Sequence, residues 1–389
     1  MDEILNRLPF FVDQIQAIKE TVISNIVLIG QMPGPTFGED ARADLFLERL
    51  SCAEVDECGK DQLKNAIGVI KGKAGKKNDP IFLTAHLDTI YSADDVDHNY
   101  IVRKNAITGP GILDNTVSVG ILASLPTILR HLKLSFSSDI VLAGVTQSIG
   151  RGNLRGIRHL LNTWARPIRS GIIMEGQVLG HFNYYSEGII RGEISCDILA
   201  TGHFFTQKYK PNAILILNEV INELLNISLP QRPRCRIIIG RITGGHKHGD
   251  IAVQARLGFE IQSDSDEMVK DVYGKMEDIV EGIGQEHSVA LKLETITVQN
   301  AAALKYGHPL VKCTVAVMKS LGLKPVSESS ESELSVFLSR NIPAVVLGMT
   351  TGKNAHLANA TMRINPMFTG IAQTIGLLLA IDKGLCDDK

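Results

Sequence analysis

Residues 81–91 read IFLTAHLDTIY, an apolar run that ends in two polar residues, His86 and Asp88. The apolar half is typical of a strand buried in a sheet, and open α/β sheets place their functional groups after the carboxyl ends of such strands. His86 and Asp88 are two positions apart on an extended backbone, so both side chains should face the same way. An imidazole there can bind a metal while the carboxylate orients it. The alternative is a strand-end histidine paired with a surface aspartate, which is favoured when these residues are taken alone.

Further along the chain, three more potential ligands follow apolar segments. Asp114 lies between a glycine turn and an apolar helix in ITGPGILDNTVSVGILASL, Glu175 ends the short strand GIIME, and His356 lies in GKNAHLAN after the strand AVVLG. Because a sheet brings the ends of its strands together, the four residues taken jointly favour a site. The sequence therefore predicts a metal site made of His86, Asp114, Glu175 and His356.

Length and composition indicate an ordinary globular chain. With 389 residues it is longer than one hydrophobic core usually supports, so we expect two domains or one domain with a large insertion. Hydrophobic residues make up 44% and charged residues 21% of the chain, and the formal net charge is −2. This balance excludes collagen, coiled coil and disorder, and gives no electrostatic case for nucleic acid or an anionic membrane as a partner.

The same sequence gives expectations about location. The start, MDEILNRLPFF, lacks the basic and apolar regions of a signal peptide. The longest strongly apolar tract, near residues 371–381, is shorter than the roughly 20 residues of a membrane span. The six cysteines contain no CxxC pair, so neither a disulfide framework nor a thiolate zinc site is indicated. We therefore expect a soluble cytoplasmic protein with reduced thiols.

The periodicity of apolar residues predicts an α/β domain interrupted by a smaller α+β domain. For the first part we expect an amphipathic helix over about the first 27 residues, a turn at Pro33 to Gly38 and a helix at Glu39 to Leu50. Alternating strands and helices follow at Ala66 to Ile70, Ile81 to Ala85, Val117 to Leu132, Ile140 to Val145, Gly156 to Trp164 and Gly171 to Met174.

The pattern changes near Gly188 to that of a ferredoxin-like unit. Strands are expected at Gly192 to Ala200, Arg234 to Ile242, Ala252 to Gln262 and Ala290 to Thr297, with helices at Pro211 to Leu225 and Asp266 to Ile283. The α/β pattern resumes with helices from Pro309 to Leu321 and Glu333 to Arg340, a strand at Ala344 to Leu347 and a closing helix to Ile381. The expected division is 1–188 with 305–389, and 189–304 as the insertion.

At this point the chain resembles the di-zinc metallopeptidases and deacylases that include peptidase T, carboxypeptidase G, acetylornithine deacetylase and succinyl-diaminopimelate desuccinylase. The resemblance extends over nearly the whole chain and rests on His86, Asp88, Asp114, Glu175 and His356 in the family's order. It implies a phosphorylase/hydrolase-like α/β domain with a mixed sheet, and an inserted lid and dimerisation domain, so a homodimer is expected.

The resemblance also implies a role for each matching residue. His86, Asp114 and Glu175 match the ligands of one zinc, and Asp114 bridges to a second zinc held partly by His356. Asp88 matches the aspartate that supports His86. The implied reaction is hydrolysis of an amide bond in a small peptide or an N-acyl amino acid, with zinc as Lewis acid.

The sequence departs from the family in the stretch QSIGRG (147–152), where the family has a glutamate pair. The first glutamate, the general base, is replaced by Gln147, and the second, a zinc ligand, is replaced by Ser148. An amide cannot accept a proton, and general base catalysis is typically worth ~10² to 10⁴-fold. We therefore expect one zinc and an incomplete second zinc site, with Glu333 or Asp88 as substitute bases if the chain hydrolyses amides.

The inserted domain departs from the family as well. Thr206 stands where the family has a substrate-binding histidine, although His203 is close by; Gly249 stands at an asparagine, and Gln262 at an arginine that grips a substrate carboxylate. After His356, the family glutamate is replaced by Ala360. These losses motivate a second hypothesis, that the chain is a non-catalytic binding or regulatory relative that keeps the fold and at most one metal.

Three other polar groups have simpler interpretations. His246, His248 and Asp250 could bind a metal, but a solvated loop is the favoured interpretation. The run Ser329 to Glu333 resembles a helix cap with acidic first-turn residues, although Glu333 also matches a family aspartate near the site. A lysine cluster follows the strand Ala66 to Ile70 and is expected to be a solvated turn, at Lys71, Lys73, Lys76 and Lys77.

Overall fold

The computed structural model describes residues 1–75, 78–198 and 211–388, and the chain divides into two compact units. The first unit contains Met1–Tyr185 and Ala303–Lys389, and the second contains Ser186–Ala302. The chain crosses between them at the short strands β9 (Tyr185–Ser186) and β14 (Ala302–Ala303). One unit is thus inserted into the sequence of the other.

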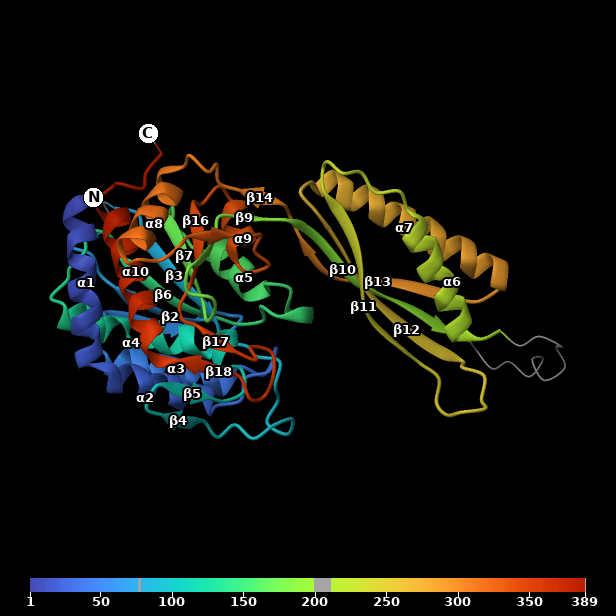
Figure 1. Cartoon of the computed structure of the whole chain (residues 1–389), viewed down its shortest axis with the longest axis horizontal. Coiled ribbons are helices and arrows are strands. Elements are labelled where there is room, and N and C mark those ends of the chain that lie inside the picture. The colour runs from blue at the N-terminus through green and yellow to red at the C-terminus, as the bar shows by residue number, and fades with distance from the viewer. Residues whose placement is uncertain (76–77, 199–210, 389) are drawn as a thin grey trace. The chain divides into compact units, whose positions relative to one another are not determined.

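The first unit is built around an eight-stranded mixed sheet (Figure 1). Its order is β1-β2-β6-β3-β7-β16-β8-β15. The strands have the bounds β1 (Glu57–Lys60), β2 (Ala66–Ile70), β3 (Ile81–His86), β6 (Ile140–Val145), β7 (Ser170–Glu175), β8 (His181–Asn183), β15 (Val326–Ser327) and β16 (Ala344–Gly348).

The centre of this sheet consists of the four neighbouring parallel strands β6, β3, β7 and β16. Almost every residue in them is buried, because helices cover both faces and the strands are continuous apolar runs rather than alternating ones. Since the four strands are parallel and adjacent, their carboxyl ends lie along one edge of the sheet. That edge is where the predicted ligands should converge.

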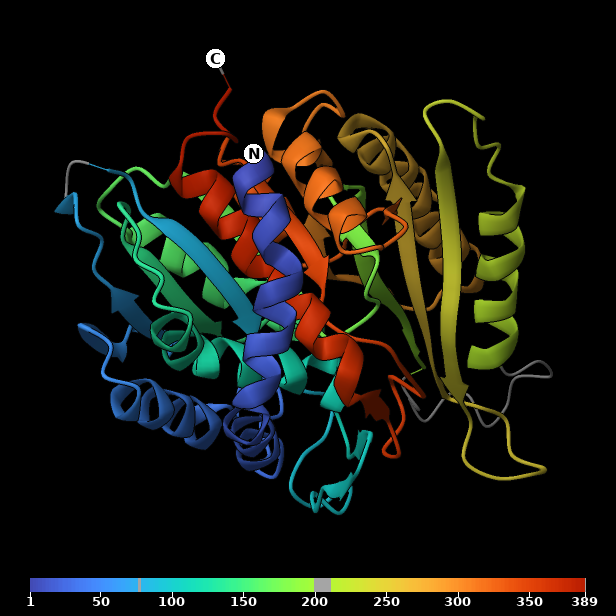
Figure 2. The same ribbon diagram turned by 60° about the vertical axis from the view of Figure 1, so that its left-hand side comes forward.

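The helices of the first unit are α1 (Asp2–Ala17), α2 (Lys19–Gly30), α3 (Asp40–Cys52), α4 (Val117–His131), α5 (Arg155–Thr163), α8 (Pro309–Ser320), α9 (Leu334–Leu338) and α10 (Ile364–Asp382). The prediction of one helix over the first 27 residues is wrong, because Ile18 is non-helical with φ −110° and separates α1 from α2. The break lets α1 pack on α10 while α2 packs on α4; Figure 2 shows α1 and α10 side by side.

A second, four-stranded sheet in the first unit has the order β17-β18-β5-β4. Its strands are β4 (Ile101–Arg103), β5 (Ala106–Thr108), β17 (Gly352–Lys353) and β18 (Thr361–Arg363). The loop between β17 and β18 carries His356, so the pairing of β18 with β5 holds that loop beside the segment leading to Asp114.

The second unit has the element order β10 (Gly188–Asp197), α6 (Ala213–Asn226), β11 (Cys235–Gly244), β12 (Gln254–Ser263), α7 (Asp266–His287) and β13 (Leu291–Gln299). This is the βαββαβ order of a ferredoxin-like unit, as predicted. The sheet is antiparallel in the order β11-β12-β10-β13, and both helices pack on it to form a separate core (Figure 1). The predicted α/β class with an α+β insertion is confirmed.

Two helical segments, Ile112–His131 and Ile364–Asp382, are long and apolar enough to cross a membrane by length and composition alone. The sequence analysis predicted that no apolar tract is long enough for a membrane span, and by length and composition that prediction is wrong. However, 89% and 83% of their apolar windows are buried inside the structure. Both form the core of the first unit, and this burial accounts for their composition.

Candidate metal centre

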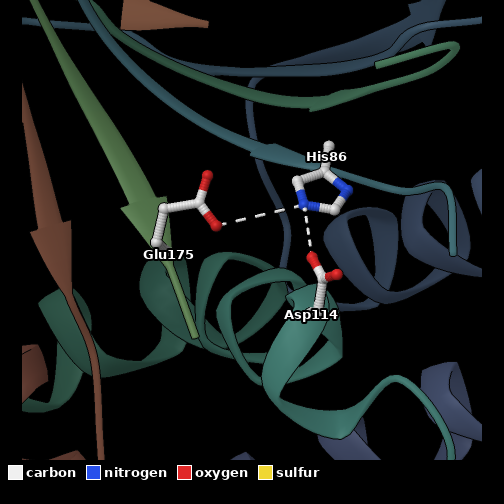
Figure 3. A group of neighbouring side chains, drawn as sticks. All are labelled: His86, Asp114 and Glu175. Atoms are coloured by element: carbon white, nitrogen blue, oxygen red, sulfur yellow. Dashed lines mark ion pairs between the residues drawn. The ribbon is translucent and has the colours of Figure 1, made fainter. Parts of the chain in front are cut away.

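Two of the predicted ligands end neighbouring strands. His86 is the last residue of β3 and Glu175 the last residue of β7, and β3 and β7 run parallel as direct neighbours. Both side chains therefore emerge at the same edge of the sheet, where they point toward one another (Figure 3).

The third ligand, Asp114, is brought to this edge by a turn that packs against the end of β7. It lies in the turn Ile112–Thr116 just before α4. The side-chain amide of Asn115 donates a 2.8 Å hydrogen bond to the carbonyl of Met174. A Cβ on Gly176 would lie 2.2 Å from the carbonyl oxygen of Leu113, so this close approach requires glycine. The two contacts place Asp114 opposite Glu175.

The three side chains form a compact cluster with one potential ligand atom each. His86 Nε2 lies 3.2 Å from Oδ1 of Asp114 and 4.0 Å from Oε2 of Glu175. All three ligand atoms lie within 4.8 Å of one another, and within the described ranges no other histidine, cysteine and carboxylate group is arranged in this way. The structure thus brings together three of the four residues predicted as ligands.

The hydrogen bonds of His86 leave its Nε2 nitrogen for the cluster. Its Nδ1 lies 3.0 Å from the backbone carbonyl of Asp88 and 3.5 Å from Oδ1 of that residue. A carbonyl oxygen can only accept, so we assign the proton to Nδ1. With a metal bound, Nε2 would be the nitrogen that offers its lone pair, on the side that faces Asp114 and Glu175.

Burial and charge perturb all three groups. Burial raises the pKa of Glu175 to about 8, with the negative charges of Glu333 and Asp114 adding to the effect and His86 opposing it. Burial opposes protonation of His86, yet Asp114, Asp88 and Glu175 together raise its pKa well above the usual range. Burial also acts against ionisation of Asp114, but the adjoining His86 and His356 lower its pKa. Such mutually perturbed groups are typical of functional sites.

The fourth predicted ligand, His356, lies at the periphery. Its Nδ1 is 3.6 Å from Oδ2 of Asp114, and its side chain is 72% exposed. The hydroxyl of Tyr91 donates a 3.0 Å hydrogen bond to the backbone carbonyl of His356, which ties the loop to the segment after β3. His356 therefore faces Oδ2 of Asp114, whereas His86 faces Oδ1.

Asp88 is buried and held by several donors. Its Oδ2 accepts hydrogen bonds from the hydroxyl of Thr36 at 2.9 Å and from the backbone amides of Ser148 and Ile149 at 2.9 and 2.8 Å. Its other oxygen faces His86. Because these contacts fix the carboxylate, Asp88 is suited to orienting His86 rather than to accepting a proton from a substrate or water.

The QSIGRG turn lies at the same sheet edge, just beyond the end of β6. The backbone amide of Gln147 donates to Oε1 of Glu39 at 2.8 Å, and its side-chain oxygen is buried with no hydrogen-bond partner among the described residues. The hydroxyl of Ser148 donates to Oε1 of Glu333 at 2.7 Å. Gln147 and Ser148 therefore do lie beside the cluster, and neither contributes a carboxylate.

Three polar residues of the site were missed or interpreted differently from the sequence. Thr36 and Glu39 lie in a segment predicted only as a turn and the start of a helix, and no spacing links them to Asp88 or Gln147. Glu333 was interpreted chiefly as part of a helix cap. In the structure it makes no capping hydrogen bond; the hydroxyl of Ser332 accepts the amide of Leu334 instead.

The remaining candidates lie elsewhere. His246, His248 and Asp250 are exposed, and Asp250 pairs with Lys247 at 3.5 Å, in keeping with a solvated loop. Gln262 is buried in the sheet of the second unit, where it contacts Arg236 and Glu260. Gly249 is exposed and Ala360 is buried. His203, Thr206, Lys76 and Lys77 lie outside the described residues.

The donor set fits a divalent transition metal. Imidazole nitrogen and carboxylate oxygen are both donor types that bind zinc, and the Nδ1 contact of His86 is the outer support that such a ligand needs. Without a cation, two partly exposed carboxylates would lie beside each other at the sheet edge.

Comparison with known proteins by sequence gives one family match. The sequence model of peptidase family M28 matches residues 65–148, the part that contains His86, Asp114 and the start of the QSIGRG turn. No curated protein matches the chain by sequence.

Several solved structures share the fold over nearly the whole chain. Aminopeptidase PepT from Bacillus cereus is 15% identical, with a TM-score of 0.71 over 93% of this chain and 98% of that one. The di-peptidase Dug1p from Saccharomyces cerevisiae is 12% identical, with a TM-score of 0.77 over 97% and 98%. A dinuclear metal-binding peptidase of the M20 family from Bacillus subtilis is 15% identical, with a TM-score of 0.66 over 95% and 99%.

The comparisons agree on the fold of the chain. The chain shares the fold of the peptidase T and M20 peptidase structures over nearly its whole length, and residues 65–148 match the M28 peptidase model. In the QSIGRG turn, Gln147 and Ser148 carry no carboxylate.

Proposed function

We propose that the protein is a zinc-dependent hydrolase that cleaves an amide bond of a small peptide or an N-acyl amino acid. The observation that carries this proposal is the cluster of His86, Asp114 and Glu175 at the carboxyl edge of the parallel strands. Bound zinc would act there as a Lewis acid on a carbonyl oxygen and on water.

The chain's own residues supply orientation. Asp88 fixes the ring of His86, and Asn115 fixes the turn that carries Asp114. Gln147 has no basic group, so any proton transfer must use another residue. Of the two substitutes expected from the sequence, Asp88 is held by three donors, so Glu333 is the better candidate among them.

The test is reconstitution with zinc followed by assay on a panel of dipeptides, tripeptides and N-acyl amino acids. We expect the wild type to hydrolyse at least one of these substrates. Chelation should abolish this activity and added zinc should restore it, and the His86→Ala variant should show no activity. Hydrolysis that survives chelation would contradict a metal-dependent mechanism. The absence of turnover on the whole panel, with metal bound, would contradict the hydrolase proposal.

A second candidate function is a non-catalytic binding protein on the same scaffold. The observation that favours it is the buried side-chain oxygen of Gln147, a neutral amide where a base is expected. Calorimetric binding of the same peptides without turnover would support this function.

We further propose a homodimer formed through the second unit. Its strand β11 is the edge of the described sheet and exposes Ile238 and Ile242. Sedimentation should give a dimer that Ile242→Lys converts to a monomer; a monomeric wild-type chain would contradict this.

For location we propose the cytoplasm. The six cysteines are all free thiols, which fits a reducing compartment. Fractionation of cells that express the chain, with thiol labelling, checks this.

A further inference from the structure

Two of the six cysteines lie in contact, although they are far apart in the sequence. Cys313 lies on α8 and is partly exposed, whereas Cys386 lies in the segment after α10 and is 4% exposed. The sulfur of Cys313 is 3.5 Å from the backbone carbonyl of Leu385, the residue before Cys386. The thiol of Cys386 hydrogen-bonds the sulfur of Cys313 directly. The fold therefore brings two free thiols together from separate elements.

The segment that carries Cys386 is held in place by contacts on both sides of this residue. Before it, the backbone amide of Leu385 donates a 3.0 Å hydrogen bond to the end of α10. After it, the guanidinium of Arg169 donates two hydrogen bonds to Asp387, at 3.1 and 2.7 Å. Cys386 itself belongs to the hydrophobic core of the first unit, and Cys313 packs against that core. These contacts keep the two sulfurs beside each other.

A cavity gives access to Cys386 at the amino edge of the central strands. It has a volume of about 450 Å³, and its lining includes Cys386, Arg169, Asn78 and Ser170. Ser170 is the first residue of β7, whose last residue is the metal-centre residue Glu175. The cavity therefore lies at the opposite end of β7 from the metal centre. A small polar oxidant can reach the thiol pair from this cavity without entering the metal centre.

The two thiols differ in how readily they ionise. The hydrogen bond from Cys386 lowers the pKa of Cys313, and burial opposes this shift. The same contact, together with burial, raises the pKa of Cys386. The thiolate is the reactive form of cysteine, so Cys313 is the sulfur that attacks an oxidant first and Cys386 is the sulfur that reacts second.

We propose that Cys313 and Cys386 form a modification site, which hydrogen peroxide closes to a reversible disulfide. The contact between the sulfurs, the fixed position of the segment and the cavity beside Cys386 carry this proposal. In a reducing compartment both cysteines remain thiols until peroxide is present, and a dithiol reductant reopens the bond. The alternative is that both cysteines serve only as small apolar side chains of the core.

The reaction with peroxide takes place in two steps. In the first step the sulfur of Cys313 attacks one oxygen of hydrogen peroxide, so an S–O bond forms and the O–O bond breaks. The departing hydroxide takes up the proton of the Cys313 thiol and leaves as water. In the second step the sulfur of Cys386 attacks the sulfur of Cys313, so the S–S bond forms and the S–O bond breaks. The hydroxide released takes up the proton of Cys386, and the peroxide, reduced by the electron pair that the two sulfurs lose, ends as water.

The disulfide joins two elements of the first unit that already pack together. It ties α8 to the segment after α10, and α8 and α10 are in contact. The chain between residues 313 and 386 becomes a closed loop that contains β16 and the segment with His356. A cross-link of this kind removes conformations from the unfolded chain. Peroxide should therefore stabilise the first unit against urea.

The experiment treats the untagged full chain with a small excess of hydrogen peroxide, blocks the remaining thiols with iodoacetamide and digests the chain with trypsin without reduction. Cleavage after lysine releases Cys313 within the peptide CTVAVMK and Cys386 within the peptide GLCDDK. We expect mass spectrometry of the monomer band to find the two peptides joined, and to find them separate after dithiothreitol. Separate alkylated peptides after peroxide, or peptides joined to other cysteines, would overturn the proposal.

Stability gives a second readout, which core packing alone would not change. The urea midpoint of the wild type should rise on oxidation and return to its first value on reduction. Cys313→Ser should show neither the joined peptides nor this shift. The matched control is Cys52→Ser, at an exposed cysteine of α3, which should show both. An oxidised wild type whose midpoint does not rise would overturn the anchoring of the segment. If Cys313→Ser does not fold, the peptides of the wild type decide alone: joined peptides support the proposal and separate peptides overturn it.

Discussion

The backbone amide of Ser148 donates a 2.9 Å hydrogen bond to Oδ2 of Asp88, the residue whose other oxygen faces His86. The QSIGRG turn (147–152), which contains no glutamate, is therefore joined to the support of His86. The role of this turn at Asp88 comes from its backbone, since the amides of Ser148 and Ile149 hold the carboxylate whatever side chains they carry.

The support of His86 gives the first prediction. Asp88→Asn should lower zinc affinity by roughly 10 to 100-fold, because it removes the negative charge beside Nδ1 of His86 and offers the amides of Ser148 and Ile149 a neutral partner. Competition titration with a chromophoric chelator measures this. Asp94→Asn, at an exposed position, is the control and should not change the affinity. Equal affinities in both variants would show that Asp88 does not support the ligand.

The close approach at Gly176 gives a second prediction. In Gly176→Ala the new Cβ would meet the backbone of Leu113 at 2.2 Å, so the turn that carries Asp114 must move away from β7. We expect a loss of about 1–3 kcal/mol in the free energy of unfolding and weaker zinc binding. The control is Gly274→Ala, which has open space within α7 and should stabilise by up to about 1 kcal/mol. Urea unfolding with and without zinc distinguishes the two.

A buried ion pair far from the cluster predicts how stability depends on pH. Burial alone would raise the pKa of Asp139, but hydrogen bonds from Arg166 at 2.7 Å and from the amide of Gly72 at 2.9 Å lower it. A lowered folded-state pKa means that the stabilisation is complete above the unfolded value of about 3.9 and is lost as pH falls through the folded value.

Asp139→Asn should therefore cost about 1–2 kcal/mol at pH 7, and the difference from wild type should shrink toward zero near pH 2. Urea unfolding at several pH values checks this. A difference that stays constant between pH 7 and pH 2 would show that the charge of Asp139 is not what stabilises the fold.

Much of the fold could be predicted because its local signals are strong. The strands Ala66–Ile70 and Ile140–Val145 were predicted with the bounds they have, since each is a short apolar run bounded by polar residues. The break at Ile18 could not be predicted. No proline or glycine marks it, and it follows from packing of α1 and α2 on different helices.

The site residues that lie at the ends of strands could be predicted from the sequence. Those that loops bring together could not. His86 and Glu175 follow from the sheet alone. Glu333 contacts Ser148 across a sequence separation of 185 residues, and Thr36 contacts Asp88 across 52. Such contacts depend on tertiary packing, which single-sequence periodicity does not encode, so neither contact could be predicted.

Removal of the metal gives the last prediction. A ligand that binds only the folded state stabilises it by RT ln(1 + [L]/Kd), about 2.7 kcal/mol at a free concentration of one hundred times Kd. Chelation should therefore lower the melting temperature of the wild type, and zinc should restore it. His86→Ala loses a ligand of the cluster, so its melting temperature should respond weakly to either treatment. His246→Ala, in the exposed loop, should respond as the wild type does. An equal response in His86→Ala and the wild type would place the stabilising metal away from the cluster of His86, Asp114 and Glu175.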